Sequence, residues 1–154
     1  MVEKCKEQTF IMVKPDGVSR GLVGQIISRF EARGFCLVAM KLTKPDKSVF
    51  EKHYEEHLAR PFFPALLSYV QSGPVVALVF QGLDVVRAAR KMIGETKPLE
   101  SLPGTIRGDF AIDMGRNVIH GSDSVESAKR EIGIWFKPEE VAAPFKADFS
   151  MIYE

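Results

Sequence analysis

Cysteine is scarce in this chain, which holds only Cys5 and Cys36 among its 154 residues. Two cysteines without metal-type spacing exclude a disulfide scaffold and suit a reducing compartment. Long apolar runs are missing as well, because none approaches the roughly 18 residues of a membrane span. The polar residues 1–8 also lack the apolar core of a secretory signal. We therefore expect a cytoplasmic protein without a membrane span.

The chain also lacks an excess of charge of either sign. Its 21 Lys and Arg residues are nearly balanced by 20 Asp and Glu residues, and the net charge is +1. That balance excludes a general role in coating polyanions, although a local basic pocket stays possible. An apolar fraction of 45% and a charged fraction of 27% are typical of a globular protein. At this length we expect a single domain that spans residues 1–154.

Apolar runs bounded by turn residues predict buried strands, and helical periodicity predicts helices between them. The expected strands are residues 9–13, 35–42, 75–80 and 117–119. The expected helices are residues 22–33, 48–58, 61–70 and 83–93, followed by a helix that Asp123 caps and that includes Ile132. Without the inserted helices the order is βαββαβ. This order predicts an α+β fold, a two-layer, ferredoxin-like α/β sandwich whose four-stranded sheet is mostly antiparallel and carries helices on one face.

The segment from Gly94 to Gly115 fits none of these elements. It contains two prolines, four glycines and little sustained periodicity over its 22 residues. An irregular segment of this length is uncommon in a small domain and is often functional. The alternative is a mobile surface insertion.

His120 lies in the segment Asn117-Val-Ile-His-Gly-Ser-Asp123, between a short strand and a capped helix. A neutral imidazole in that place is a candidate nucleophile beside backbone N–H groups that favour anionic ligands. Glu131, on the inward edge of the next helix, is the candidate acceptor that would hold one ring nitrogen. Ser122 would link that carboxylate to the loop. The alternative is a structural or solvated histidine next to an ordinary helix cap.

Arg90 interrupts the apolar stripe of its expected helix, so its guanidinium must snorkel, pair with an acid or point into a polar cleft. Arg107 adds a second guanidinium from the long loop, Lys14 ends the first strand, and Thr96 offers a neutral donor. Cations from separate elements around a histidine suit a polyphosphate. Ordinary surface salt bridges are the alternative.

Two further patterns lie between residues 53 and 63. In Arg60-Pro-Phe-Phe63, only one of the adjacent rings can point fully into the core, which leaves the other as a platform for a nucleobase. Packing of both rings in one core is the alternative.

The stretch His53-Tyr-Glu-Glu-His57 matches the H-x-x-E-H pattern of zinc peptidases, with both histidines on one helix face. Its mostly polar neighbours favour a solvated amphipathic helix instead.

These blocks together resemble the nucleoside diphosphate kinase family, from about Gln8 to Glu154. The histidine segment is the most specific of them. The other blocks with the family's features are Thr9–Gly17, Arg60–Phe63, Ser72–Val75, Gly94–Thr96, Pro103–Asp109 and Trp135–Phe136.

The resemblance implies transfer of the γ-phosphate of a nucleoside triphosphate, typically ATP, to a nucleoside diphosphate. The implied route is a ping-pong mechanism through a phosphohistidine on His120, with broad base specificity. Mg²⁺ would be bound mainly through the nucleotide phosphates, so no metal-ligating residues are expected. The resemblance also implies a homo-oligomer, expected to be a hexamer, and allows nucleic acid as a secondary partner. The alternative is a non-catalytic scaffold of the same fold that binds nucleotides or nucleic acid.

The resemblance assigns roles by position. The catalytic set is His120, Glu131, Lys14, Tyr54 and Ser122. The nucleotide-binding set is Lys14, Arg60, Phe62, Leu66, Arg90, Thr96, Arg107, Met114 and Asn117. Within these sets the phosphate clamp is Arg60, Arg90, Thr96 and Arg107, and Phe62 stacks on the base. The loop from Gly94 to Gly115 would cover the nucleotide and contact neighbouring subunits. Two departures from the family pattern are Met114, where a smaller branched residue is frequent, and Met151, where an aromatic is expected.

Overall fold

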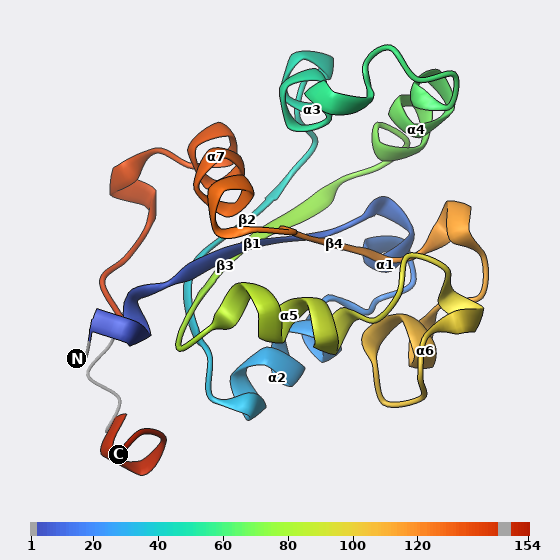
Figure 1. Cartoon of the computed structure of the whole chain (residues 1–154). Helices are drawn as coiled ribbons and strands as arrows, with labels where there is room; N and C mark the ends of the chain where they lie inside the picture. The colour runs from blue at the N-terminus through green and yellow to red at the C-terminus, as the bar shows by residue number, and fades with distance from the viewer. Residues whose placement is uncertain (1–2, 145–148) are drawn as a thin grey trace.

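The computed structural model describes residues 3–144 and 149–154, and its centre is one antiparallel sheet (Figure 1). The four strands are β1 (Gln8–Val13), β2 (Cys36–Thr43), β3 (Val75–Gln81) and β4 (Ile119–Gly121). They lie in the order β2-β3-β1-β4, and each neighbouring pair is antiparallel. This order and the βαββαβ succession confirm the ferredoxin-like α+β fold.

Seven α-helices lie in the described residues. They are α1 (Pro15–Ser19), α2 (Val23–Arg33), α3 (Lys47–His53), α4 (Phe63–Val70), α5 (Val85–Ile93), α6 (Ile106–Phe110) and α7 (Val125–Trp135). Short 3₁₀ turns occur at Glu3–Lys6, Glu55–His57, Pro98–Glu100, Met114–Arg116, Pro138–Glu140 and Phe149–Met151. Within the described ranges, no helix has the length and apolar character that crossing a membrane requires.

Helices cover both faces of the sheet, so the prediction that they lie on one face alone was wrong. Helices α2 and α5 lie on one face, and α3, α4 and α7 lie on the other (Figure 1). Every residue of β3 is buried, and its alternate side chains enter two separate clusters. A continuous apolar run, rather than a polar alternation, is what a strand with two covered faces requires. The helices expected as insertions, α3 and α4, thus cover the second face together with α7.

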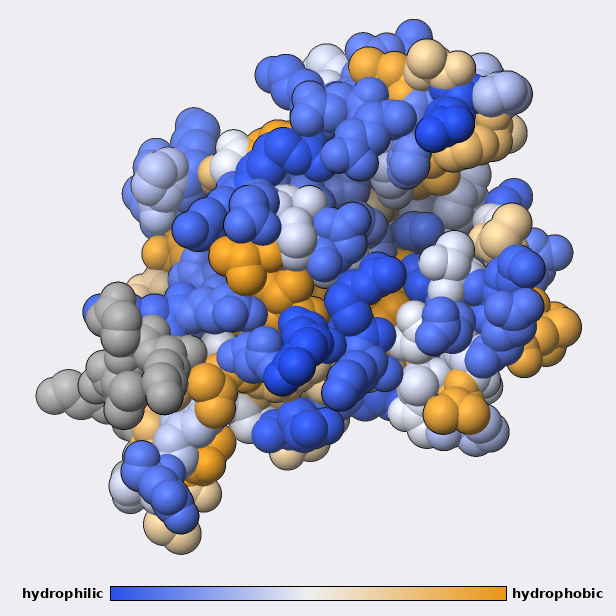
Figure 2. Space-filling model, in the orientation of Figure 1, coloured by the Kyte–Doolittle hydropathy of each residue, from blue (hydrophilic) through white to orange (hydrophobic). Residues whose placement is uncertain are grey.

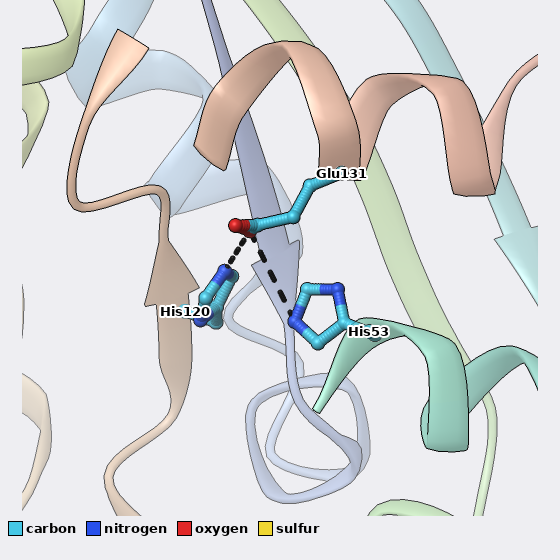
Figure 3. Close-up of side chains that lie close together, drawn as sticks. All are labelled: His53, His120 and Glu131. Carbon is cyan, nitrogen blue, oxygen red and sulfur yellow. Dashed lines mark hydrogen bonds and ion pairs between the residues drawn. The ribbon is translucent and has the colours of Figure 1, made fainter. Parts of the chain in front are cut away.

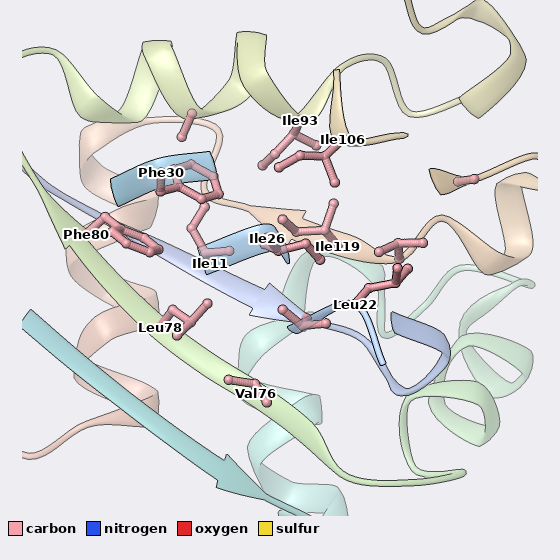
Figure 4. Packing of buried hydrophobic residues seen from close by; sticks show 14 of the residues in the cluster. Ile11, Leu22, Ile26, Phe30, Val76, Leu78, Phe80, Ile93, Ile106 and Ile119 are labelled. Atoms are coloured by element: carbon pink, nitrogen blue, oxygen red, sulfur yellow. The ribbon is translucent and has the colours of Figure 1, made fainter. Parts of the chain in front are cut away.

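The face beneath α2 and α5 carries an apolar core (Figure 4). The rings of Phe30 and Phe80 stack with centroids 4.7 Å apart, and both side chains are fully buried. Ile11 of β1 and Ile93 of α5 complete the centre of this cluster. Close packing of this kind fixes the position of the strands.

The opposite face mixes aromatic and polar side chains. Phe10 of β1 stacks on Trp135 of α7 at 5.4 Å, and Phe50 of α3 meets Trp135 edge-on at 5.7 Å. These rings dock α3 and α7 on β1, next to the short strand β4. The candidate nucleophile therefore lies where this aromatic core meets the edge of the sheet.

Several element boundaries differ from the prediction. The helix expected over residues 48–58 stops at His53 and gives way to the 3₁₀ turn Glu55–His57. The cap of α7 is Ser124 rather than Asp123, because the Ser124 hydroxyl accepts a hydrogen bond from the Ser127 amide. The segment 94–115 is not wholly irregular, since it carries α6, which the Thr105 hydroxyl caps.

The strand expected over residues 117–119 begins only at Ile119, because a tight turn precedes it. Val118 has a φ of 73°, which is a genuine outlier for a β-branched residue. The Ile119 amide donates to the Asn117 carbonyl at 2.8 Å and closes this turn. Two contacts hold the outlier in place: the Asp16 carboxylate accepts from the Val118 amide at 3.0 Å, and the Lys14 amide donates to the Val118 carbonyl at 2.8 Å.

Candidate active site

A pocket of about 640 Å³ opens between α3, α4, the 94–116 segment, β4 and α7. Most of the expected site residues line it: Lys14, Tyr54, Phe62, Leu66, Arg90, Thr96, Arg107, Met114, Asn117, His120 and Glu131. Ser122 lies fully buried, in contact with the Glu131 carboxylate. Arg60 is exposed and does not line the pocket, so its place in a phosphate clamp stays a prediction.

His120, in the middle of β4 and opposite Met12 of β1, has one ring nitrogen engaged. Its Nε2 is hydrogen-bonded to Oε1 of Glu131, which reaches down from α7 (Figure 3). The Ser122 hydroxyl donates to the same oxygen at 3.3 Å. An ionised carboxylate only accepts, so the Nε2 proton lies between the two groups and Nδ1 keeps its lone pair. The geometry thus produces a neutral imidazole with a free nitrogen.

Electrostatics favour the same protonation state. Burial lowers the pKa of His120 well below its ordinary value, and the cations Lys14, Arg107 and Arg90 lower it further. Burial raises the pKa of Glu131, while the neighbouring His53 and Arg130 and the Ser122 hydrogen bond oppose that rise. The imidazole is therefore neutral near pH 7, which is the form that attacks electrophiles.

Three cations converge on the pocket without a salt bridge to any described carboxylate. Burial, reinforced by Arg107, lowers the pKa of Lys14 to about 8, and its ammonium donates to the Asn117 side-chain oxygen at 2.7 Å. The Arg90 guanidinium donates to the Gly121 carbonyl at 3.3 Å. Unneutralised cations around a cavity favour an anionic ligand over the alternative of surface salt bridges.

Arg107 has a structural task that sequence reasoning missed. Its guanidinium donates to the carbonyls of Glu95 at 3.1 Å, Ile119 at 2.7 Å and Asn117 at 3.3 Å. These bonds tie the 94–115 segment to the start of β4. Because a guanidinium has five N–H donors, donors remain for a ligand. Burial and the nearby Arg90 lower its pKa to about 10.

Of the two adjacent phenylalanine rings, only one enters the core, which confirms one of the two predicted alternatives. Phe63 is buried in the aromatic core, whereas Phe62 is 51% exposed and lines the pocket. The Phe62 ring meets His57 edge-on at 5.3 Å. A half-exposed ring that is supported from one side is a suitable stacking platform for a planar ligand.

Tyr54 holds a polar atom that is buried without compensation. Its hydroxyl lines the pocket and has no hydrogen-bond partner among the described residues. Burial raises its pKa, so the hydroxyl keeps its proton and stays a donor. A buried donor without a partner is costly and rare, and points to a ligand atom that would accept from it.

His53 is the main site residue that sequence reasoning did not find in this role. Its ring is buried, Trp135 Nε1 donates to its Nδ1 at 3.0 Å, and its Nε2 lies 4.0 Å from Oε1 of Glu131. The sequence did carry an indication that His53 is buried. Phe50 and His53 are three residues apart on one face of a helix, and Phe50 is strongly apolar.

The zinc-peptidase interpretation of His53 and His57 is wrong. The first histidine ends α3 and the second lies in a separate 3₁₀ turn, so they do not share a helix face. Ligand atoms of His53, His120 and Glu131 do lie within 4.8 Å of one another. However, the indole N–H of Trp135 occupies Nδ1 of His53, which leaves the proton rather than a lone pair on Nε2. We therefore treat this trio as a hydrogen-bond cluster.

Comparison with known proteins gives one consistent result. The family model described as nucleoside diphosphate kinase matches residues 7–141. A nucleoside diphosphate kinase of Emericella nidulans is 64% identical over 148 residues, which cover 96% of this chain and 97% of that protein. A cytosolic nucleoside diphosphate kinase of Dictyostelium discoideum is 62% identical over 141 residues, which cover 92% and 91%. Among solved structures, a halophilic nucleoside diphosphate kinase from Halobacterium salinarum in complex with CDP has a TM-score of 0.94 at 42% identity, covering 97% of this chain and 99% of that one.

Proposed function

Because the chain belongs to the nucleoside diphosphate kinase family and catalyses phosphotransfer between nucleotides, we propose that His120 carries the phosphoryl group between donor and acceptor. The observation that supports this is the engaged Nε2 of His120, held by Glu131 beside a pocket lined with cations. The Nδ1 lone pair attacks the γ-phosphorus, an N–P bond forms, and the bond to the β-phosphate oxygen breaks. A terminal oxygen of the acceptor diphosphate then attacks the phosphorus and releases the histidine.

The cations of the pocket bind the negatively charged phosphates during this transfer. Lys14, Arg90 and Arg107 contact the phosphates, with Thr96 as a neutral donor at the pocket wall. The buried Tyr54 hydroxyl donates to the phosphoryl group in transit, which supplies its missing partner. Each contact strengthens as the transferred group approaches its in-line geometry, so it lowers the barrier rather than only tightening binding.

The side chains that line the pocket fit Mg²⁺ only when the nucleotide phosphates hold the ion. Lys14, Arg90 and Arg107 repel a free cation, and the Glu131 oxygen is already engaged by His120. Mg²⁺ would be held through the phosphates that Lys14, Arg90 and Arg107 contact, and it would neutralise part of their charge. We assign Asn117 to the sugar, and the Lys14 ammonium, which holds its side chain at the pocket wall, supports that role.

Base recognition at this pocket is by stacking. Phe62 presents its ring at the pocket, with Leu66 and Met114 beside it. Stacking is tolerant of base identity because every base has a π-face, so we propose broad specificity among nucleotides. The CDP named with the Halobacterium relative is consistent with a pyrimidine in such a site.

Exposed apolar side chains support a homo-oligomer, for which we propose a hexamer. Met40 and Leu42 are 54% and 67% exposed on the edge strand β2. Leu102 and Ile112, in the loop around α6, are 74% and 76% exposed, and hydrophobic groups stand out in that region of the surface (Figure 2). Open edges and apolar patches favour association between copies of a chain. Light scattering of the purified protein would give the number of subunits.

A cytoplasmic location is part of the same proposal, supported by the cytosolic Dictyostelium relative and by the low cysteine content. The non-catalytic scaffold is not favoured, since the relatives at this identity are named as kinases and Lys14, Arg90 and Arg107 line the pocket. Nucleic-acid binding as a secondary role stays a prediction.

The decisive experiment is labelling of His120. The protein is mixed with γ-labelled ATP and quenched, and we expect an acid-labile, alkali-stable phosphoenzyme that an unlabelled nucleoside diphosphate removes. His120→Ala should bind nucleotide but take up no label. His57→Ala, which removes a histidine outside the relay, should still be labelled and chased. Labelling that persists in His120→Ala would overturn the proposal.

A further inference from the structure

His53 is a buried histidine that the mechanism above does not use, although it lies directly behind the proposed nucleophile. Its ring centroid is 4.6 Å from that of His120, and the two rings meet edge-on at 75°. It also packs against Phe10 at 5.6 Å and against Tyr54 at 4.6 Å. We propose that His53 is a positioning residue, whose Nε2–H, oriented by Trp135, is directed at the Glu131 carboxylate and holds it as the acceptor for His120. This inference rests on the proposed function of His120.

The tautomer of His53 follows from its partner. An indole N–H is a donor only, so the 3.0 Å bond from Trp135 Nε1 requires a lone pair on His53 Nδ1. Burial, together with the neighbouring His120, lowers the pKa of His53 to about 2, so the ring is neutral and its single proton lies on Nε2. The same bond fixes the rotation of the ring, because Trp135 is itself stacked on Phe10.

The Nε2 proton of His53 is directed at the Glu131 carboxylate, which is the hydrogen-bond partner of His120. Its Nε2 lies 4.0 Å from Oε1 of Glu131, the same oxygen that meets Nε2 of His120 and the Ser122 hydroxyl (Figure 3). At that distance the interaction is an electrostatic contact rather than a hydrogen bond. Contacts of this kind in a free enzyme commonly tighten once substrate is bound.

The carboxylate needs such support because it is almost completely buried. A protonated Glu131 could donate its own proton to Nε2 of His120, and the imidazole proton would then lie on Nδ1, the atom that must attack. Around Glu131 the charged and polar groups are His53 from α3, Tyr54 next to it, His120 from β4, Ser122 from the loop, and Arg130 and Asp123 on or before its own helix. Asp123 opposes ionisation, whereas the N–H of His53 favours it.

The test compares three substitutions in the full-length protein. His53→Leu removes the donor, His53→Gln keeps a side-chain N–H near the position of Nε2, and Trp135→Phe removes the bond that fixes the tautomer. We expect His53→Leu to slow phosphorylation by ATP about tenfold to a hundredfold, as loss of outer partners does elsewhere. The KM for nucleotide should change little, because we assign the phosphate contacts to Lys14, Arg90 and Arg107 and not to His53. His53→Gln should recover most of the rate, and Trp135→Phe should lie between.

A pH profile separates positioning from general loosening of the core. In His53→Leu the acidic limb of the phosphorylation rate should move to higher pH, since Glu131 protonates more readily, and His53→Gln should move it back. Phe50→Leu is the matched control, because its ring packs on Trp135 but does not approach Glu131. It should lower the melting temperature and leave the acidic limb in place. The ¹⁵N shifts of the wild-type imidazoles should show the Nε2–H tautomer for His53.

Three results would overturn the inference: an unchanged rate and limb in His53→Leu, the same shift in Phe50→Leu, or an Nδ1–H tautomer of His53. Each presumes that the wild-type protein forms the phosphohistidine. If it forms none, the proposed function fails instead, so the two failures are distinguishable.

Discussion

The two faces of the sheet differ in what their side chains do. Beneath α2 and α5 the cluster is apolar throughout, and its central contact is the stacked pair Phe30 and Phe80. Beneath α3, α4 and α7 the cluster adjoins His53, Glu131 and Ser122, which are buried polar side chains. The same strand, β1, supplies Ile11 to the first face and Phe10 to the second.

This difference shows how a small protein keeps a polar site in place. Burying polar groups costs free energy unless each one finds a partner, so the site face is less able to stabilise the chain by itself. The apolar face supplies that stability and fixes β1 and β4, from which Lys14 and His120 extend. Substitutions of apolar side chains on the first face should therefore affect folding, and those of polar side chains on the second face should affect chemistry.

The largest expected effect is on the apolar face. Phe80→Ala should lower the free energy of unfolding by about 3–5 kcal/mol, because it removes a fully buried ring and leaves a cavity against Phe30. Urea unfolding measures the loss, and the phosphorylation rate per folded molecule should stay near that of the wild type. A large loss of rate with little loss of stability would show that the faces are not separate.

At the pocket, the substitution that corresponds to Phe80→Ala is Phe62→Ala. Since this ring is half-exposed, its removal should change stability by no more than about 0.5 kcal/mol. Binding of purine and pyrimidine nucleotides should weaken alike, by about 1–3 kcal/mol, as loss of a stacking platform predicts. Fluorescence titration with four diphosphates gives the comparison, and an effect confined to one base would contradict stacking as the main contact.

The site face should also respond to pH. Burial lowers the pKa of Lys14 to about 8, so its ammonium loses its proton, and with it its charge, as the pH rises above that value. We expect kcat/KM for ATP to fall by about tenfold per pH unit above pH 8. Lys14→Arg keeps its charge at these pH values, and its profile should stay flat there whatever its absolute rate. A wild-type profile that is flat to pH 9.5 would exclude Lys14 as the titrating group.

The smallest expected change in stability comes from Tyr54→Phe. Its hydroxyl is buried without a partner among the described residues, so removing it should leave the free energy of unfolding unchanged or raise it by about 1 kcal/mol. The rate of phosphorylation should fall at the same time, because a donor to the transferred group is lost. Paired unfolding and single-turnover measurements test this, and marked destabilisation would mean that the hydroxyl has a partner in the free protein.

Much of this molecule was predictable because the signals are local. The strands β1, β2 and β3 show as apolar runs, and the stop at Gly34 has the positive φ, 108°, that favours glycine. The fold class followed from the order of these elements. The face that each helix covers did not, because a helical pattern in the sequence does not reveal which side of a sheet the helix will pack on. Ser124 and Asp123 were equally good caps by composition, and only the local turn selected Ser124.

The amino-acid sequence by itself determined the chemistry-bearing residues and the family to which the chain belongs, since residue identity and order are enough for both. The tertiary structure alone decided which of them meet. Lys14 and Asn117 are separated by 103 residues, and His53 and Trp135 by 82, yet both pairs are in hydrogen-bond contact. The convergence of two histidines and a serine on one Glu131 oxygen has the same origin. Contacts over such separations depend on how helices pack across a sheet, and no local pattern of residues encodes that distance.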